Sequence, residues 1–193
     1  MQNDPAPLPL DVALVHYPVV NKSGETIGAA LTNLDLHDIA RACRTFGVGT
    51  FYVVTPYPDQ QEMVREILAH WLTGHGARAN PDRGEALALV RICDDLAALY
   101  DAVTAERGSR PTVLATSAKS GDGSWTYGQA RSTIAAGGPV LLLFGTAWGM
   151  APEVLSAANG LLPPIVGPDV RYNHLSVRSA VSIILDRLLG KRS

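Results

Sequence analysis

One stretch of the chain, residues 139–144 with the sequence PVLLLF, carries no polar side chain. A stretch this short and this apolar predicts a β-strand that is buried on both faces, as in the middle of a parallel sheet. Such a strand needs a neighbour on each side and a covering layer above and below, because a bare sheet face would expose hydrophobic side chains to water. The fold must therefore supply further strands and two covering layers.

Similar apolar stretches recur along the chain. They predict strands at residues 12–16, 51–54, 90–93 and 112–116, and a short extended piece at 164–166. Hydrophobic residues at helical spacing predict helices at residues 35–46, 60–72, 85–90, 95–106, 127–136, 152–158 and 176–189. Asp35 is expected to cap the first of these helices. Strands that alternate with helices predict an α/β fold, with a mostly parallel sheet and helices on both faces.

Composition narrows the class of protein. The chain has 193 residues, of which 47% are hydrophobic and 18% charged, and this excludes an intrinsically disordered chain. The net charge of −2 excludes binding of nucleic acid through a bulk positive charge, so contact with RNA would need a local patch. No apolar run reaches the roughly 18 residues of a membrane span. The first residues do not have the pattern of a signal peptide.

The same features predict domain organisation and location. Residues 1–10, rich in proline, are expected to form a flexible leader, and residues 11–193 a single domain. Cys43 and Cys93 belong to no CxxC motif, which favours two reduced thiols in a cytoplasmic protein. The histidines follow no HxxxH or HxE pattern, so no metal site is expected.

Three loops rich in small and polar residues follow predicted strands in the C-terminal half, at residues 117–123, 145–149 and 167–173. Ligands of parallel sheets bind at the carboxyl ends of the strands, where such loops meet. The chain has no GxxxxGK[ST] phosphate loop, no GxGxxG dinucleotide motif and no GxSxG nucleophile motif. The residues alone therefore leave the ligand open, and a nucleotide-binding α/β enzyme of unknown class is one alternative.

Three longer segments carry more specific patterns. They are ALTNLDLHDIARACRTFGV at residues 30–48, LLLFGTAWG at 141–149 and PPIVGPDVRYNHLSVRSAVSIILDRLLG at 163–190. Their features are an arginine six positions before a glycine, a glycine loop after a central apolar strand, and an N/H-x-S-V entry into the last helix. Together these segments resemble the SPOUT methyltransferases, the α/β-knot class of RNA methyltransferases. The resemblance extends over nearly the whole chain and is nearest to a small stand-alone bacterial group without an added RNA-binding domain.

The resemblance implies S-adenosylmethionine as the cofactor, an RNA substrate (tRNA or rRNA), a deep C-terminal trefoil knot and a homodimer. It implies that Arg41 acts on the RNA, close to the cofactor of the partner subunit. The residues it places around the cofactor are Thr116, Ser117, Phe144, Gly145, Thr146, Gly149, Ile165, Gly167, Tyr172, Asn173, His174, Leu175 and Ser176. Further contacts with the RNA are expected from His16, Lys22, Arg44 and Arg171.

Two positions depart from the pattern of members that methylate ribose. Those members usually carry asparagine six positions before the arginine, where this chain has Asp35. They also carry asparagine two positions before the serine of the last motif, where this chain has His174. Methylation of a base and of a ribose hydroxyl are therefore both open. A non-catalytic protein that binds S-adenosylmethionine or a nucleotide is the alternative function.

Overall fold

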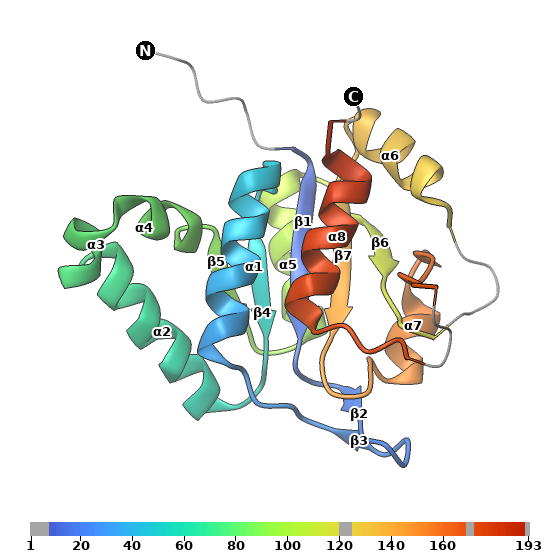
Figure 1. Ribbon diagram of the computed structural model, residues 1–193, viewed down its shortest axis with the longest axis horizontal. Coiled ribbons are helices and arrows are strands. Elements are labelled where there is room, and N and C mark those ends of the chain that lie inside the picture. Colours follow the sequence, from blue (N-terminus) through green and yellow to red (C-terminus); the bar gives the residue numbers. More distant parts are fainter. Residues whose placement is uncertain (1–7, 120–124, 169–171, 192–193) are drawn as a thin grey trace.

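The computed structural model describes residues 8–119, 125–168 and 172–191, and a parallel β-sheet runs through its middle (Figure 1). The strands lie in the order β5 (Val90–Cys93), β4 (Phe51–Val54), β1 (Leu10–Val15), β7 (Val140–Gly145), β6 (Thr112–Ala115) and β8 (Gly160–Leu161). Each neighbouring pair is parallel. The apolar strand β7 lies between β1 and β6. The predicted sheet with a buried central strand is thus confirmed.

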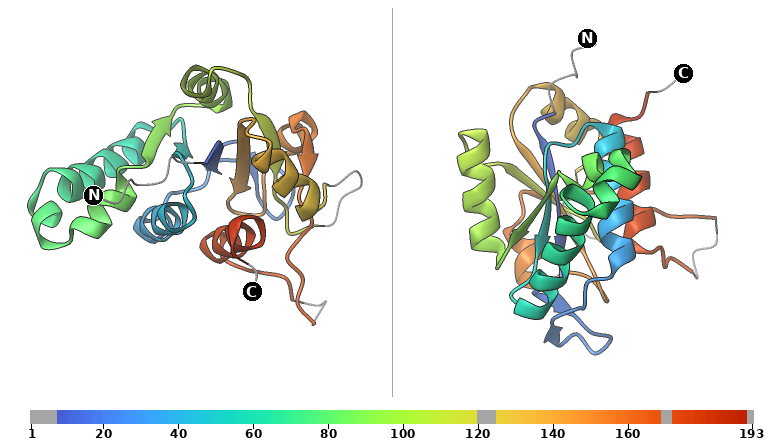
Figure 2. Two further views of the ribbon diagram at one scale, coloured as in Figure 1. Left: turned by 90° about the horizontal axis from the view of Figure 1, so that it is seen from above. Right: turned by 90° about the vertical axis from the view of Figure 1, so that its left-hand side faces the viewer.

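Side chains that alternate along the strands fill two hydrophobic cores, one on each face of the sheet. On β1, Val12 and Leu14 belong to the first core, while Ala13 and Val15 belong to the second. The first core is covered by α1 (Asn33–Phe46), α2 (Pro58–Leu72), α4 (Pro81–Leu87), α6 (Tyr127–Ala135) and α8 (Val177–Leu189). The second core is covered by α5 (Leu96–Arg107) and α7 (Pro152–Ala157). Figure 2 shows α5 on the side of the sheet opposite α1 and α8.

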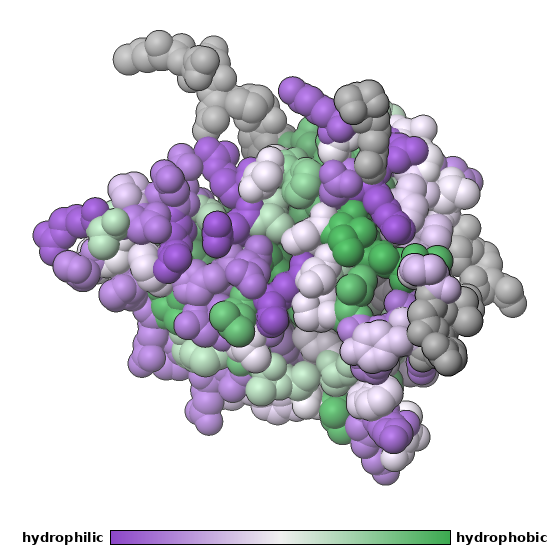
Figure 3. Space-filling model, viewed as in Figure 1, coloured by the Kyte–Doolittle hydropathy of each residue, from purple (hydrophilic) through white to green (hydrophobic). Residues whose placement is uncertain are grey.

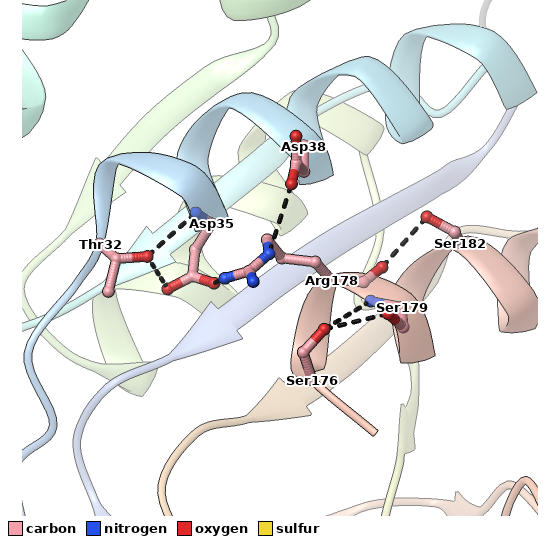
Figure 4. A network of polar contacts seen from close by, with 7 residues as sticks. All are labelled: Thr32, Asp35, Asp38, Ser176, Arg178, Ser179 and Ser182. Atoms are coloured by element: carbon pink, nitrogen blue, oxygen red, sulfur yellow. Dashed lines mark hydrogen bonds and ion pairs between the residues drawn. The ribbon is translucent and has the colours of Figure 1, made fainter. Parts of the chain in front are cut away.

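The first helix starts earlier than predicted, and its cap is a different residue. α1 begins at Asn33, because the Thr32 Oγ1 atom accepts a hydrogen bond from the backbone N–H of Asp35 at 3.2 Å and so caps the helix. The prediction that Asp35 is the cap is therefore wrong. The carboxylate of Asp35 is directed toward α8 instead, as the close-up in Figure 4 shows.

Some short elements were not predicted. A hairpin of two-residue strands, β2 (Val19–Val20) and β3 (Thr26–Ile27), follows β1, and α3 (His75–Ala79) links α2 to α4. Residues 164–166 are not a strand, and the outermost strand beside β6 is β8. Elements this short show no periodicity in the sequence, so pattern analysis does not detect them.

The start of the chain differs slightly from the predicted leader. Leu10 is the first residue of β1 and is fully buried, so the sheet includes the last residue of the predicted leader. Residues 1–7 lie outside the described part of the chain. Of the helices in the described ranges, none has the length and apolar character needed to cross a bilayer.

Candidate active site

A cavity of about 530 Å³ opens at the carboxyl edge of the sheet. Its walls come from the loops that follow β6 and β7, from residues 163–165 and from the first turns of α8, with the start of α1 on one side. This volume falls within the roughly 300–1,000 Å³ of small-molecule sites. Of the three loops predicted to meet at this edge, residues 117–119, residues 145–149 and Asn173 line the cavity, while residues 120–123 and 169–171 lie outside the described part of the chain.

Most of the residues predicted to surround a cofactor line this cavity. They are Thr116, Ser117, Phe144, Gly145, Thr146, Gly149, Ile165, Asn173, His174, Leu175 and Ser176. Gly167 and Tyr172 are not among the lining residues. Tyr172 is 73% exposed, with its ring 6.1 Å from that of His174. It therefore stands just outside the cavity mouth.

The loop after β7 folds back closely on itself at the cavity, and glycine permits this at two positions. A Cβ atom on Gly145 would lie 2.8 Å from the backbone nitrogen of Met150, so only glycine lets the loop fold back this closely. Gly149 has a φ of 109°, in the region that favours glycine. The hairpin holds this loop, because Val20 N–H donates to the carbonyl of Gly149 at 2.9 Å.

An aromatic residue for which the sequence left a place in the core and a place in the cofactor pocket both open stands at the cavity mouth. Trp148 lines the cavity, is 46% exposed, and meets the ring of His174 edge-on at 5.5 Å between centroids. In the sequence, the indication that Trp148 belongs to the site was its position in a glycine-containing loop directly after a predicted strand.

A polar network links α1 to α8 beside the cavity (Figure 4). The Arg178 guanidinium donates to Asp35 Oδ1 at 2.9 Å and lies 3.3 Å from Asp38 Oδ2. Asp35 also accepts a hydrogen bond from the Thr32 hydroxyl at 2.6 Å, and it lines the cavity. Sequence reasoning missed Arg178, because its partner lies 143 positions away and no local pattern connects the two.

Arg41, the predicted catalytic residue, does not line this cavity. It is exposed on α1 in a second groove, together with His37 and residues of α2 and α4. Within one chain, Arg41 is therefore not brought to the loops that line the cavity.

The residues predicted to contact RNA are scattered. Lys22 is exposed in the turn between β2 and β3. Arg44 lies 3.3 Å from Glu85 of α4 in an ion pair. His16 is fully buried at the end of β1, and burial lowers its pKa to about 4, so it is neutral and out of reach of RNA. Arg171 lies outside the described residues.

The described ranges of the chain contain no group of three histidine, cysteine, aspartate or glutamate residues that could hold a metal ion. The cavity itself is lined by apolar side chains, backbone groups and a few polar residues. These are the features of a site for an organic ligand rather than for a metal.

Comparison with known proteins decides the class. A family model for SAM-dependent RNA methyltransferases matches residues 9–190. The chain belongs to this family. The methyltransferase class and its S-adenosylmethionine cofactor are thus those that the sequence resemblance implied, and the non-catalytic alternative loses its support.

The methyltransferase has relatives of two lengths. It is 50% identical over 178 residues to a protein named tRNA (guanine-N(1)-)-methyltransferase from Oleidesulfovibrio alaskensis, a match that covers 92% of this chain and 41% of the relative. The chain therefore spans about two fifths of that protein. It is 37% identical over 181 residues to an uncharacterized protein of Aquifex aeolicus, covering 93% of this chain and 88% of the relative.

Solved structures support the fold of the methyltransferase. The TrmH/SpoU tRNA modifying enzyme of A. aeolicus superimposes with a TM-score of 0.56 at 17% identity, over 94% of this chain and 74% of that one. At this level of identity the likeness concerns the fold, and it matches the parallel sheet with helices described above.

Proposed function

We propose that the cavity holds S-adenosylmethionine and that the protein transfers its methyl group to a nucleotide of an RNA, with tRNA as the substrate class. The observation that carries this proposal is that the two C-terminal segments with the family pattern meet in one cavity. The name of the O. alaskensis relative supports tRNA as the substrate. Because that relative is more than twice as long, its guanine specificity is not carried over to this chain.

The lining residues fit the cofactor. S-adenosylmethionine, when bound, supplies a methyl group on a positively charged sulfur. It has no phosphate, so the lack of a phosphate loop is compatible with it. Phe144, Ile165 and Leu175 offer an apolar wall for an adenine ring, and the backbone of the loop after β7 offers hydrogen-bonding groups to its edge.

Arg41 is proposed to act on RNA at the cavity of a partner subunit. It is exposed on α1, away from the cavity of its own chain, so a second subunit would have to present it. Figure 3 shows hydrophobic surface beside α8, on the face that carries α1 and α8. Apolar surface of this kind is typical of a subunit interface. These features support the homodimer.

Residues 11–193 are proposed to form one domain with a C-terminal trefoil knot, which the likeness to the TrmH/SpoU fold supports. A cytoplasmic location is proposed, because tRNA is the substrate class and both cysteines are free and buried.

The proposed cofactor site can be tested by filling the cavity. Ala180 of α8 lines it, so Ala180→Phe would put a ring into the space for the ligand. The matched control is Ala105→Phe on the exposed side of α5, across the sheet. We expect Ala180→Phe to weaken binding of S-adenosylhomocysteine by about 100-fold or more, roughly 2.7 kcal/mol, with no change in the control. Isothermal titration calorimetry measures the affinities.

The same variants test the function. Wild-type protein and Ala105→Phe are expected to transfer tritium from labelled S-adenosylmethionine to total RNA from a strain that lacks the gene, whereas Ala180→Phe is not. Mapping the labelled RNA then identifies the nucleotide and the atom. Transfer by Ala180→Phe at the wild-type rate would contradict the assignment of the cavity.

A further inference from the structure

The part of the cavity wall that the structure describes includes a single carboxylate, that of Asp35. The residue is only 6% exposed. Its Oδ2 atom accepts a hydrogen bond from the Thr32 hydroxyl at 2.6 Å, and its Oδ1 atom accepts one from Arg178 at 2.9 Å. A carboxylate offers about four acceptor positions, two on each oxygen. These two bonds therefore leave each oxygen with capacity for a further donor from the cavity side.

The carboxylate is held in one orientation. Thr32 is fixed as the cap of α1, and Arg178 is fixed by two acidic residues of that helix, Asp35 and Asp38 (Figure 4). The positive guanidinium lies against the carboxylate, so the negative charge is matched without consuming all of its acceptor capacity. A side chain whose orientation is fixed by its neighbours needs little rearrangement before it reacts.

Methyl transfer to RNA makes a demand that this carboxylate can meet. A nitrogen or oxygen that carries a hydrogen becomes strongly acidic as it gains a methyl group, and it must lose its proton. Besides Asp35, the titratable side chains lining the cavity in the described ranges are Lys119 and His174. A lysine ammonium has no lone pair to accept a proton. His174 is exposed at the mouth and is positioned by ring contacts with Trp148 and Tyr172.

We propose that Asp35 is the proton acceptor for the RNA atom that is methylated, an inference that rests on the proposed function of the cavity. The target atom gives its lone pair to the methyl carbon, and the bond from that carbon to sulfur breaks with its electrons remaining on sulfur. The proton of the target atom passes to Asp35, which later releases it to water. An asparagine at this position could not take up a proton in this way, because its side chain is a neutral amide.

The experiment compares two aspartates that share one arginine. Asp35→Asn keeps the size of the side chain and removes its ability to accept a proton. Asp38→Asn is the matched control, because Asp38 also lies against Arg178 but does not line the cavity. Single-turnover transfer from tritiated S-adenosylmethionine to total RNA of a strain lacking the gene gives the rate. Calorimetry with S-adenosylhomocysteine and thermal unfolding give affinity and fold.

We expect Asp35→Asn to slow transfer by about 100-fold, with S-adenosylhomocysteine affinity within about twofold of wild type. Asp38→Asn loosens Arg178 but leaves the proton acceptor in place, so we expect it to slow transfer by less than about threefold. A second variant, Asp35→Ala, tests the same point through rescue: added sodium formate restores part of the rate, while sodium chloride does not. A structural role for Asp35 would lower the unfolding temperature of both asparagine variants and show no rescue.

Several results would overturn the inference. Transfer by Asp35→Asn at the wild-type rate would do so, as would a loss of cofactor affinity equal to the loss of rate. A rate lost in His174→Gln but kept in Asp35→Asn would assign the proton to His174. If the wild-type protein labels no RNA, the proposed function fails together with this inference. If the wild type labels RNA and Asp35→Asn does so equally, only the inference fails.

Discussion

At the scale of single residues, His16 shows how a polar side chain behaves when the fold encloses it. Neither ring nitrogen has a hydrogen-bond partner among the described residues, and the side chain is fully buried. Burial is the main cause that lowers its pKa to about 4, and the nearby charge of Asp35 opposes this only in part. The imidazole is therefore neutral in the folded protein, while in the unfolded chain it takes up a proton more readily.

This difference predicts a loss of stability in acid. As the pH falls from 7 to 5, the unfolded chain binds a proton at His16 and the folded protein does not, which lowers the free energy of unfolding by about 2 kcal/mol. Urea denaturation at both pH values measures this, and His16→Gln is expected to lose that share of the pH dependence. An equal pH dependence in the two proteins would show that folding does not lower the pKa of His16.

At the scale of elements, α5 is fastened to the amino ends of the strands, on the edge of the sheet opposite the cavity. Arg107, in the last turn of α5, donates from Nε to Asp11 of β1 at 2.9 Å, and Asp11 is completely buried. Glu106, beside it, accepts a hydrogen bond from the Tyr52 hydroxyl at 2.8 Å. These contacts hold the helix without involving any residue of the active site.

Removing one partner of this ion pair should be costly. Arg107→Met leaves the Asp11 carboxylate buried without its counter-charge, and we expect a loss of about 3 kcal/mol in the free energy of unfolding. Adding Asp11→Asn to that variant should recover part of the loss, because no buried charge is then left unpaired. Chemical denaturation gives both values. Unchanged affinity for S-adenosylhomocysteine is expected in both variants, since the cavity lies at the other edge.

The helices, strands and loops also show which parts of the structure could be predicted from the sequence. The strand at residues 51–54 has the bounds that its apolar run predicted, because burial on both faces leaves a continuous local signal. The edge strand at residues 90–93 also has its predicted bounds, although Arg91 is exposed. The loops that line the cavity were predictable from small residues after strands. The pairing of Asp35 with Arg178 was not, since it depends on α1 and α8 lying side by side. The sequence did not distinguish Thr32 as the cap of α1, because the nearby Asp35 is an equally suitable capping residue.

At the scale of the whole molecule, the order of the strands explains where the site lies. In the sheet, β4 and β5 lie on one side of β1, whereas β7 and β6, which come later in the chain, lie on its other side. Loops that leave neighbouring strands in opposite directions open a crevice at their carboxyl ends, which is where sheets of this type bind ligands. The cavity lies beside β7, next to this change of direction.

A shared site between two subunits makes a prediction at this scale. Sedimentation at micromolar concentration should give about twice the 20.5 kDa mass of the chain. Arg41→Ala and Ala180→Phe should each be inactive alone, and mixed dimers should regain transfer, because one composite site then has an intact cavity and an intact arginine. Mixtures that stay inactive, or a monomer that transfers methyl groups, would contradict this arrangement.

The direction of the first strand and the last helix has a consequence for how this unit can be joined to others. β1 starts at Leu10 at the amino edge of the sheet, and α8 runs from Val177 at the cavity to Leu189 at its far end. Both lead the backbone out on the side away from the cavity (Figure 1). Polypeptide fused before β1 or after α8 would therefore leave the mouth of the cavity clear. The same catalytic module can then serve in chains of very different length.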